Sequence, residues 1–522
     1  MAGGTWTTQN KVRPGLYVNV ESVPAAVGTL GERGTTTLAL PLSWGPTKQI
    51  ITIQSGEDIQ TVLGYDMTDE KMLLIREALK RAATLLLYRL NTGTHASVTV
   101  GEAGSGEEGE TQTGTTLTAQ AKYPGVRGND LAVAIQSNVD QPAQFDVKVF
   151  LAGREVEAHT VATAADVNSA WVELAGELQT SAGLTLSGGE DGEVTNEDHT
   201  DYLTAIQVES FQTVSLSSTE QSLKELYAAF VNRLREDEGV KIQAVLENDT
   251  LPDSEGVISV QNGVILADGT VLSAAEATAW VAGATAAATV NQSLTYSAYD
   301  GAVDVNPRLT NTEIESALRD GAFLFTHSDG RAIVEQDINT FTSYTPTKRQ
   351  HFSKNRVVRV LDGISNDVKR IFESFYIGQV DNNDDGRNMF RQEIVNHLSA
   401  LQGMNAIQNV DSQTDVAVVA GQDSDIFIKD VIILNDILTF ATLLVPIIAA
   451  LVEVTKRTVA YPKNFVPLVA LLLGIIVGLL AAPFSDLVVA FRLWAGALAG
   501  LAATGLFEIS NPRPGTTKRL EQ

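Results

Sequence analysis

Residues 437–507 contain three apolar stretches, and no other feature of the chain limits its fold so strongly. The stretches run from Ile437 to Val454, from Phe465 to Ala482 and from Leu487 to Phe507. The second has no charged residue, and as a helix its length of about 27 Å would match the hydrocarbon core of a bilayer. The pattern predicts transmembrane helices. The alternative is a buried helical hairpin in a soluble protein.

Small residues inside these stretches suggest how such helices would pack. Gly474 and Gly478 form one GxxxG pair, and Gly496 and Gly500 form another. Glycines at this spacing let two membrane helices approach closely. We therefore expect these four glycines to be packing residues, and we expect the C-terminal segment to lie in the cytoplasmic membrane.

The rest of the chain has the composition of a soluble, acidic protein. The 522 residues carry a formal net charge of −26, and the part before Val431 carries more negative charge than the whole. Such a surface argues against nucleic acid as a partner. The chain has no cysteine, which excludes disulfides and thiolate metal sites. Its first residues have no apolar core of a signal peptide, so we expect synthesis and assembly in the host cytoplasm.

Composition shifts predict an α+β multidomain chain. A polar arm (1–27) contains one strand, formed by Leu16, Tyr17, Val18, Asn19 and Val20. The regions that follow are an α/β piece (28–92), a β-sandwich (93–187), an α/β domain (188–340), an α+β domain (341–425) and the membrane segment (431–522).

Local patterns place individual elements within these regions. A helix is expected from Asp69 to about Ala83 with Thr68 as its N-cap, and a second helix after Ser218. AFLFTH and RAIVEQ read as two strands about a turn at Ser328-Asp329-Gly330.

The sequence contains no catalytic motif that we could identify. GxxxxGK[ST], GxSxG, HExxH and a GxGxxG after a strand are all absent. His327, Ser328 and Asp329 are the residue types of a catalytic triad, but neighbours on one turn cannot form a relay. We expect no catalytic residue, no cofactor and no enzymatic activity.

One loop resembles the start of an EF-hand. In 381–386, Asp381, Asn383 and Asp385 have the spacing of calcium ligands, but the twelfth position is Gln392 and Glu393 comes one residue late. A shift of one residue turns a helical side chain by about 100°. We favour a turn between two helices and keep a weak calcium site as the alternative.

Several segments together resemble the sheath proteins of contractile phage tails. They are VRPGLYVN (12–19), LGERGTTTLALPLSWGP (30–46), AKYPGVRGND (121–130), LSGGEDG (186–192), LTYSAYDGA (294–302), GRAIVEQDINTFTSYT (330–345), FSKNRVVRVLDGISNDVKRIFE (352–373) and MNAIQNVDSQTDV (404–416). Their order along residues 1–425 is more specific than any one of them.

The resemblance implies a structural function that accounts for the missing chemistry. Sheath proteins stack as rings of six around an inner tail tube, between a baseplate and a tail terminator, and contract to drive the tube through a target envelope. Their middle domain resembles subtilisin without its catalytic residues. Their terminal arms add strands to neighbouring subunits, and Leu16–Val20 is the best candidate here. The implied location is a virion tail or a phage-tail-like particle.

The resemblance ends near residue 425, where a polar C-terminal arm is expected. The following segment is instead similar to a small phage holin, most clearly in WAGALAGLAATGLFE (494–508). Three interpretations remain: a sheath subunit with a membrane anchor or vestigial tail, a membrane-permeabilising holin that carries a sheath, and two neighbouring phage genes joined in one chain.

Overall fold

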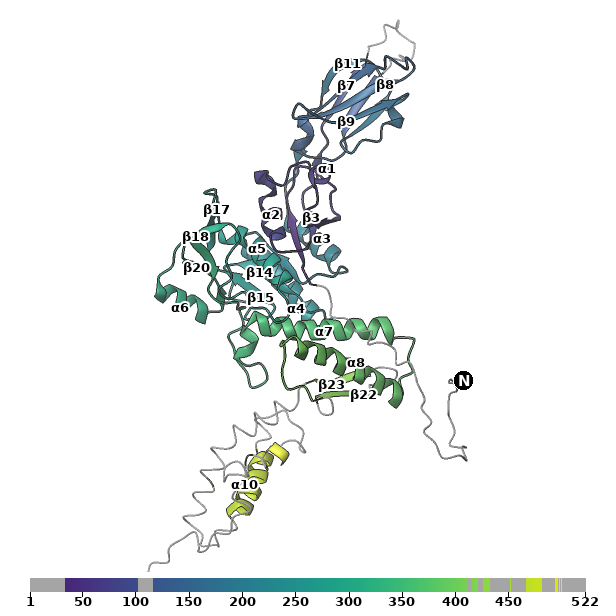
Figure 1. The fold of residues 1–522 in the computed structure, drawn as a ribbon. Coiled ribbons are helices and arrows are strands. Elements are labelled where there is room, and N and C mark those ends of the chain that lie inside the picture. The colour runs from purple at the N-terminus through teal and green to yellow at the C-terminus, as the bar shows by residue number, and fades with distance from the viewer. Residues whose placement is uncertain are drawn as a thin grey trace, which may run out of the picture. The chain divides into compact units, whose positions relative to one another are not determined.

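The computed structural model describes residues 33–101, 116–411, 415–420, 426–431 and 466–480, with single positions near residues 451 and 493–499. The described residues fall into two compact units, one within Leu30–Lys369 and the other from Arg370 onward. Each unit is described by itself below (Figure 1).

The first unit is built on a seven-stranded sheet. Its strands are β1 (Thr35–Leu40), β2 (Ile50–Gln54), β3 (Thr84–Arg89), β13 (Thr213–Ser215), β14 (Gln243–Glu247), β15 (Val257–Val260) and β19 (Ala322–Phe323). They lie in the order β19-β15-β14-β13-β1-β3-β2. All neighbours are parallel except β2, the edge strand, which is antiparallel to β3.

This sheet joins two regions that we expected to be separate domains, 28–92 and 188–340. Strand β1 pairs with β13 in the register Thr36↔Thr213, so the two regions form one fold. Sequence patterns identify strands but not their neighbours, because parallel strands can pair across any intervening segment. The α/β piece is therefore part of the larger domain, and the β-sandwich is an insertion into it.

Helices cover both faces of the sheet. α3 (Asn196–Ile206) and α4 (Gln221–Glu236) pack on one face with Ala39 and Val214. α2 (Leu73–Leu79) and α5 (Ala274–Ala287) lie on the other. Burial on both sides explains why the strand sequences are continuous apolar runs.

Two helices begin later than expected. The carboxylate of Asp69, not Thr68, caps a short 3-10 turn (Glu70–Met72) that leads into α2, while the Thr68 hydroxyl donates to Asp66. α4 follows Glu220 as its N-cap residue, and Ser218 accepts a hydrogen bond from the backbone N–H of Glu220. In both places the side chain that we predicted as the N-cap stabilises the turn before the helix instead.

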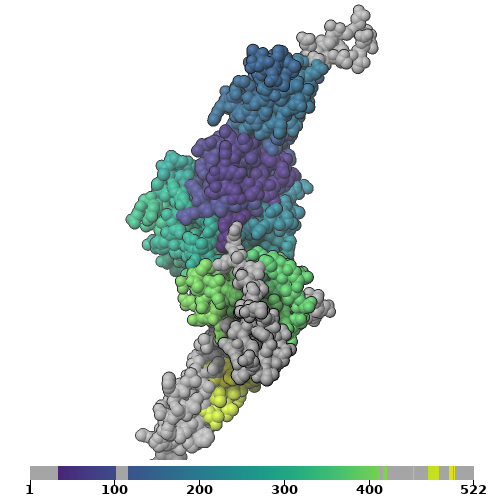
Figure 2. Space-filling model, turned by 45° about the vertical axis from the view of Figure 1, so that its right-hand side comes forward, coloured from purple at the N-terminus to yellow at the C-terminus, as the bar shows by residue number. Residues whose placement is uncertain are grey.

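The expected β-sandwich is confirmed: Figure 1 labels strands of one of its sheets, and Figure 2 shows this part of the chain, in blue, as a compact body. One sheet contains β5 (Ser97–Gly101), β6 (Thr116–Ala121) and β10 (Val172–Gly176), and the other contains β7 (Leu131–Ser137), β8 (Phe145–Leu151), β9 (Arg154–Val161) and β11 (Ser181–Thr185). Trp171 in its core lies 5.5 Å, between ring centroids, from Trp44, which follows β1. A two-residue pairing of β4 (Gly93–Thr94) with β12 (Glu190–Asp191) closes the insertion.

Smaller elements follow the central strands. β16 (Gly263–Leu266), β17 (Val271–Leu272) and β18 (Ala302–Asn306) form an antiparallel sheet, and α6 (Asn311–Arg319) comes after β18. β20 (Phe325–Ser328) and β21 (Arg331–Val334) form the expected hairpin. Its turn residues Asp329 and Gly330 have φ values of 49° and 74°, which suit Asp and Gly.

The second unit contains the end of α7 (Asn355–Phe375), α8 (Asp384–Gly403), β22 (Val416–Ala420), β23 (Ile426–Val431) and α10 (Val466–Leu480). Phe390 of α8 packs against Phe372 and Tyr376. β22 and β23 are antiparallel. We did not expect β23, because its sequence leads directly into the apolar stretches.

The described part of the chain has no helix of sufficient length and apolar character to cross a membrane. The second apolar stretch is helical over α10, which has 15 residues. Most of 437–454 and 487–507 lies outside the described residues, as do Gly496 and Gly500.

The contact between α2 and α5 provides a test of the helix packing. A Cβ atom on Gly283 would lie 2.2 Å from the backbone oxygen of Ala78, whereas a Cβ on Gly363 in α7 would meet its nearest neighbour at 3.5 Å. We expect Gly283→Ala to lower the free energy of unfolding by about 1–3 kcal/mol, since the two helices must separate. Gly363→Ala is the matched control, and it should be neutral or stabilising. Urea unfolding followed by circular dichroism measures both, and equal stabilities would contradict this packing.

Candidate functional site

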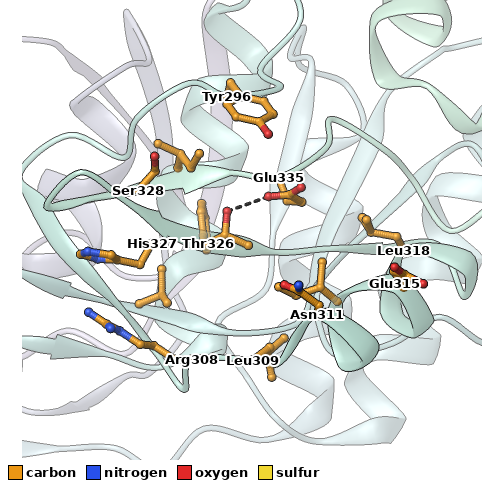
Figure 3. A pocket seen from close by; sticks show the side chains of 14 residues that line it. Tyr296, Arg308, Leu309, Asn311, Glu315, Leu318, Thr326, His327, Ser328 and Glu335 are labelled. Atoms are coloured by element: carbon orange, nitrogen blue, oxygen red, sulfur yellow. Dashed lines mark hydrogen bonds between the residues drawn. The ribbon is translucent and has the colours of Figure 1, made fainter.

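A groove of about 570 Å³ lies between α6 and the β20–β21 hairpin. Figure 3 shows Leu309, Asn311 and Leu318 on one side of it and Tyr296 on the other. Tyr296 has a φ of 62° and is 66% exposed. A bulky residue in the left-handed region carries strain, and such positions concentrate at functional sites.

The apolar side of α6 faces this groove without being buried. Thr310 and Glu313 form a capping box that begins the helix. Ile314 and Leu318 line the groove, yet no residue of α6 is buried. Helices usually bury such a stripe, so α6 has the character of a surface that accepts a partner.

Charged groups lie at the rim of the groove. Arg308 donates two hydrogen bonds of 2.9 Å to Asp304. These bonds, together with the backbone N–H of Val305, lower the pKa of Asp304 to about 2. Nδ1 of His327 lies 3.2 Å from Oδ1 of the same carboxylate, and Thr326 donates to Glu335 at 2.7 Å.

The triad residue types do not form a catalytic arrangement. His327 faces Asp304 rather than Asp329, which occupies the turn. Ser328 pairs with Arg331 across the hairpin. The groove can therefore bind by shape and charge, and it holds no nucleophile activated by a base.

The calcium candidates lie at the beginning of a helix. Asp384 and Asp385 form the first turn of α8, and the Asn383 side chain accepts from the backbone N–H of Gly386 as its N-cap. Helical backbone from Asp384 onward cannot wrap around an ion as an EF-hand loop does. Among the residues that the structure describes, no three His, Asp or Glu side chains are placed to hold a metal ion.

A second polar site is a stripe of polar side chains along α7, which we did not predict from the sequence. Its residues recur every three or four positions: Asn355, Arg359, Asp362, Asn366 and Lys369. This spacing places them on one helix face. All five bond to other parts of the first unit. In chain order, their partners are the Asp337 carboxylate, the Gln292 carbonyl, the Arg235 guanidinium, the Lys241 backbone and the Glu238 carbonyl.

The central contact of the stripe is an ion pair between Arg235 and Asp362. The guanidinium donates two hydrogen bonds, of 2.7 and 2.9 Å, and both side chains are largely buried. Burial alone would lower the pKa of Arg235, but the charge and hydrogen bonds of Asp362 outweigh it and raise the pKa. Before α7, Lys348 pairs with Glu255 inside the unit, at 2.8 Å.

A loop before α7 is held in place by one carboxylate. Asp253 accepts hydrogen bonds from the backbone N–H groups of Thr342 and Ser343. Beyond them Tyr344 is 50% exposed, and its ring lies 5.8 Å from that of Phe341. The loop thus presents an aromatic side chain on a fixed backbone.

The remaining candidates from the sequence are only partly described. The strand Leu16–Val20 lies outside the described residues. Gly474 and Gly478 lie one turn apart within α10.

Comparisons with known proteins assign most of the chain to one family. Four models match in order: "Tail sheath protein Gp18 domain III N-terminal region" (33–90), "Phage tail sheath protein beta-sandwich domain" (91–191), "Phage tail sheath protein central domain" (192–340) and "Phage tail sheath C-terminal domain" (347–433). The chain therefore belongs to the phage tail sheath family, and its function is that of a structural sheath subunit.

Relatives and a solved structure agree with this assignment. Protein YqbK of Bacillus subtilis is 38% identical over 461 residues, which cover 82% of this chain and 96% of that relative. The crystal structure of the sheath tail protein from Desulfitobacterium hafniense superposes with a TM-score of 0.68 at 51% identity, over 78% of this chain and 93% of that one.

The C-terminal segment resembles a small phage holin, as expected. Residues 432–518 match the model "Bacteriophage A118-like holin, Hol118". They also explain a 41% identity over 76 residues to a putative antiholin of Listeria phage A118, covering 14% of this chain and 78% of that relative. The sheath match ends at 433, where the holin match begins.

The buried ion pair of the α7 stripe gives a stability prediction. Asp362→Asn should lower the free energy of unfolding by about 3–5 kcal/mol, because it leaves the charge of Arg235 buried without its main partner. The double variant Arg235→Met/Asp362→Leu should recover most of this loss. Urea unfolding compares the three proteins, and a double variant as unstable as Asp362→Asn would contradict the interpretation.

The Asp253 loop gives a pH prediction. Burial alone would raise the pKa of Asp253, but hydrogen bonds from Ser343 and Thr342 outweigh it and lower the pKa. Its contribution is therefore present above the unfolded pKa of about 3.9 and is lost as the pH falls through the lower folded pKa. Asp253→Asn should cost about 1 kcal/mol at pH 7. The difference from the unmodified chain should shrink below about pH 4. A constant difference from pH 7 to pH 2 would exclude this role.

Proposed function

We propose that residues 1–433 form a contractile tail sheath subunit that polymerises around an inner tube and shortens to drive the tube through a target envelope. The observation that carries the proposal is the series of four sheath models that match in order between residues 33 and 433. Strand β23 ends at Val431, so the last described strand of the sheath part is complete before the holin match takes over.

The partners of this assembly follow from the same proposal. They are further copies of this chain in rings of six, an inner tail tube protein, a baseplate and a tail terminator, in a virion tail or a phage-tail-like particle assembled in the host cytoplasm. The strand Leu16–Val20 would add to a neighbouring subunit.

The role is structural rather than enzymatic. The parallel sheet agrees with a subtilisin-like domain, but the described residues bring no Ser, His and Asp together as a triad. Mutation of His327 should therefore abolish no hydrolytic activity.

A second candidate function belongs to the C-terminal segment, and the holin match favours it. We propose that this segment lies in the host membrane, as an anchor of the sheath or as a holin-type lysis element. Leu468, Leu472 and Ile476 form an exposed apolar stripe on α10. Gly474 and Gly478 lie about 200° from Leu472 and Ile476 on the helix, so lipid contact and helix packing would use opposite sides.

The sheath proposal is tested by electron microscopy of two purified proteins, the full chain and residues 1–433. We expect the shorter protein to form ordered tubes and the full chain to associate with membranes and to form fewer tubes. The cut follows β23, because ending at residue 425 would remove the partner of β22.

A third protein, residues 1–425, serves as the control for this boundary and should be less stable than 1–433. Monomeric 1–433 at high concentration would refute the sheath proposal. Full-length protein that stays wholly soluble on fractionation would refute the membrane proposal. That result would leave the sheath proposal unaffected.

A further inference from the structure

We propose that the groove beneath α6 is an interface between copies of this chain, and that it receives the loop Ser343–His351 of a second copy. The inference rests on the proposed self-assembly and adds to it the two surfaces that meet. Its grounds are the unfilled groove with Ile314 and Leu318 on its α6 side, the exposed aromatic ring of the loop and the opposite charges of the two.

The groove offers a site of suitable size for an aromatic side chain. Its volume of about 570 Å³ is open to solvent along Ile314 and Leu318, and exposed Tyr296 stands at its edge. A groove that offers both apolar side chains and polar groups can receive an aromatic side chain with a polar tip, such as the tyrosine ring common at protein interfaces.

The charge of the groove is acidic. Arg308 pairs with Asp304 and Glu315 pairs with Arg319, so these four charges balance and the Glu335 carboxylate leaves a net negative charge. Glu315 has a side chain that is 66% exposed, and its ion pair with Arg319 is a single exposed i,i+4 contact. Such a pair contributes little and can exchange its partner.

The loop has the complementary properties. It contains Lys348, Arg349 and His351 but no acidic residue. Lys348 is occupied by Glu255, whereas Arg349 makes no ion pair within the described residues and donates only to the Pro346 carbonyl, at 3.4 Å. Tyr344 lies five residues before this guanidinium and points an exposed ring outward from Phe341.

Prior fixation of the loop lowers the cost of binding. The bonds from Thr342 and Ser343 to Asp253 set the backbone before Tyr344, and Thr345 accepts from the backbone N–H of Lys348. A preformed loop loses less conformational entropy when it docks.

The two surfaces share no residue, so the contact is heterologous. Each copy would present its loop to one neighbour and its groove to another. Repetition of such a contact produces a closed ring or a helical array, and not a twofold dimer.

A charge exchange tests the contact in the full chain, purified in mild detergent. Arg349→Glu and Glu315→Arg should each raise the concentration needed for half of the protein to sediment by about tenfold, as expected for loss of a central interface contact. Combining them should return it to within about threefold of the unmodified chain. Asp140→Arg, on an exposed turn of the β-sandwich, is the matched charge control and should have no effect.

Two results would overturn the proposal: single variants that assemble like the unmodified chain, or a double variant no better than the worse single one. Circular dichroism spectra of the variants separate lost docking from lost folding. A failure of the sheath proposal is distinguishable, because the unmodified chain itself would then form no tubes.

Crosslinking supplies a test that does not depend on tubes. The chain has no cysteine, so Tyr344→Cys/Leu318→Cys introduces the only thiols. Under mild oxidation the double variant should give a ladder of trimers and larger species on a non-reducing gel, while each single variant stops at the dimer. A double variant that also stops at the dimer would show that the loop does not enter the groove.

Discussion

The pairing of β1 with β13 is the contact on which the architecture depends. The Thr213 hydroxyl donates to Thr36 and to the Ala282 carbonyl, and Thr37 bonds to Tyr202. The bond between Thr213 and Thr36 ties together chain segments 177 residues apart at the centre of the parallel sheet. Without this pairing, β1 and β13 would each expose a row of unpaired backbone N–H and C=O groups in the middle of the sheet.

Two kinds of contact, apolar packing and directional polar bonds, stabilise the first unit. The sheet and its helices are joined by apolar burial, which tolerates small rearrangements of side chains. The first turns of α7 are joined through bonds with fixed directions, including those of Asn355, Arg359 and Asp362. Polar contacts in a buried setting require a defined register, because a shift of one residue would leave each group unpaired.

Many of the helices, strands and turns could be predicted from residues near one another in the chain. The apolar runs of β1 and β3, the turn at Asp329 and Gly330 and the helices α4 and α5 follow from local patterns. β23 was missed because its apolar sequence continues into a longer apolar segment. The α7 stripe has a readable helical spacing, but its partners come from three separate segments of the first unit: residues 235–241, Gln292 and Asp337.

The sequence by itself determined much of the secondary structure, the sheath and holin resemblances and the acidic, cysteine-free character of the protein. Secondary structure and family resemblance follow from the local order of residues, and charge and cysteine content follow from the overall composition. Only the tertiary structure decided that regions 28–92 and 188–340 share one sheet, that Asp304 rather than Asp329 faces His327, and that Ile314 and Leu318 border an unfilled groove. Each of these depends on which distant segments become neighbours, and no local preference specifies that choice.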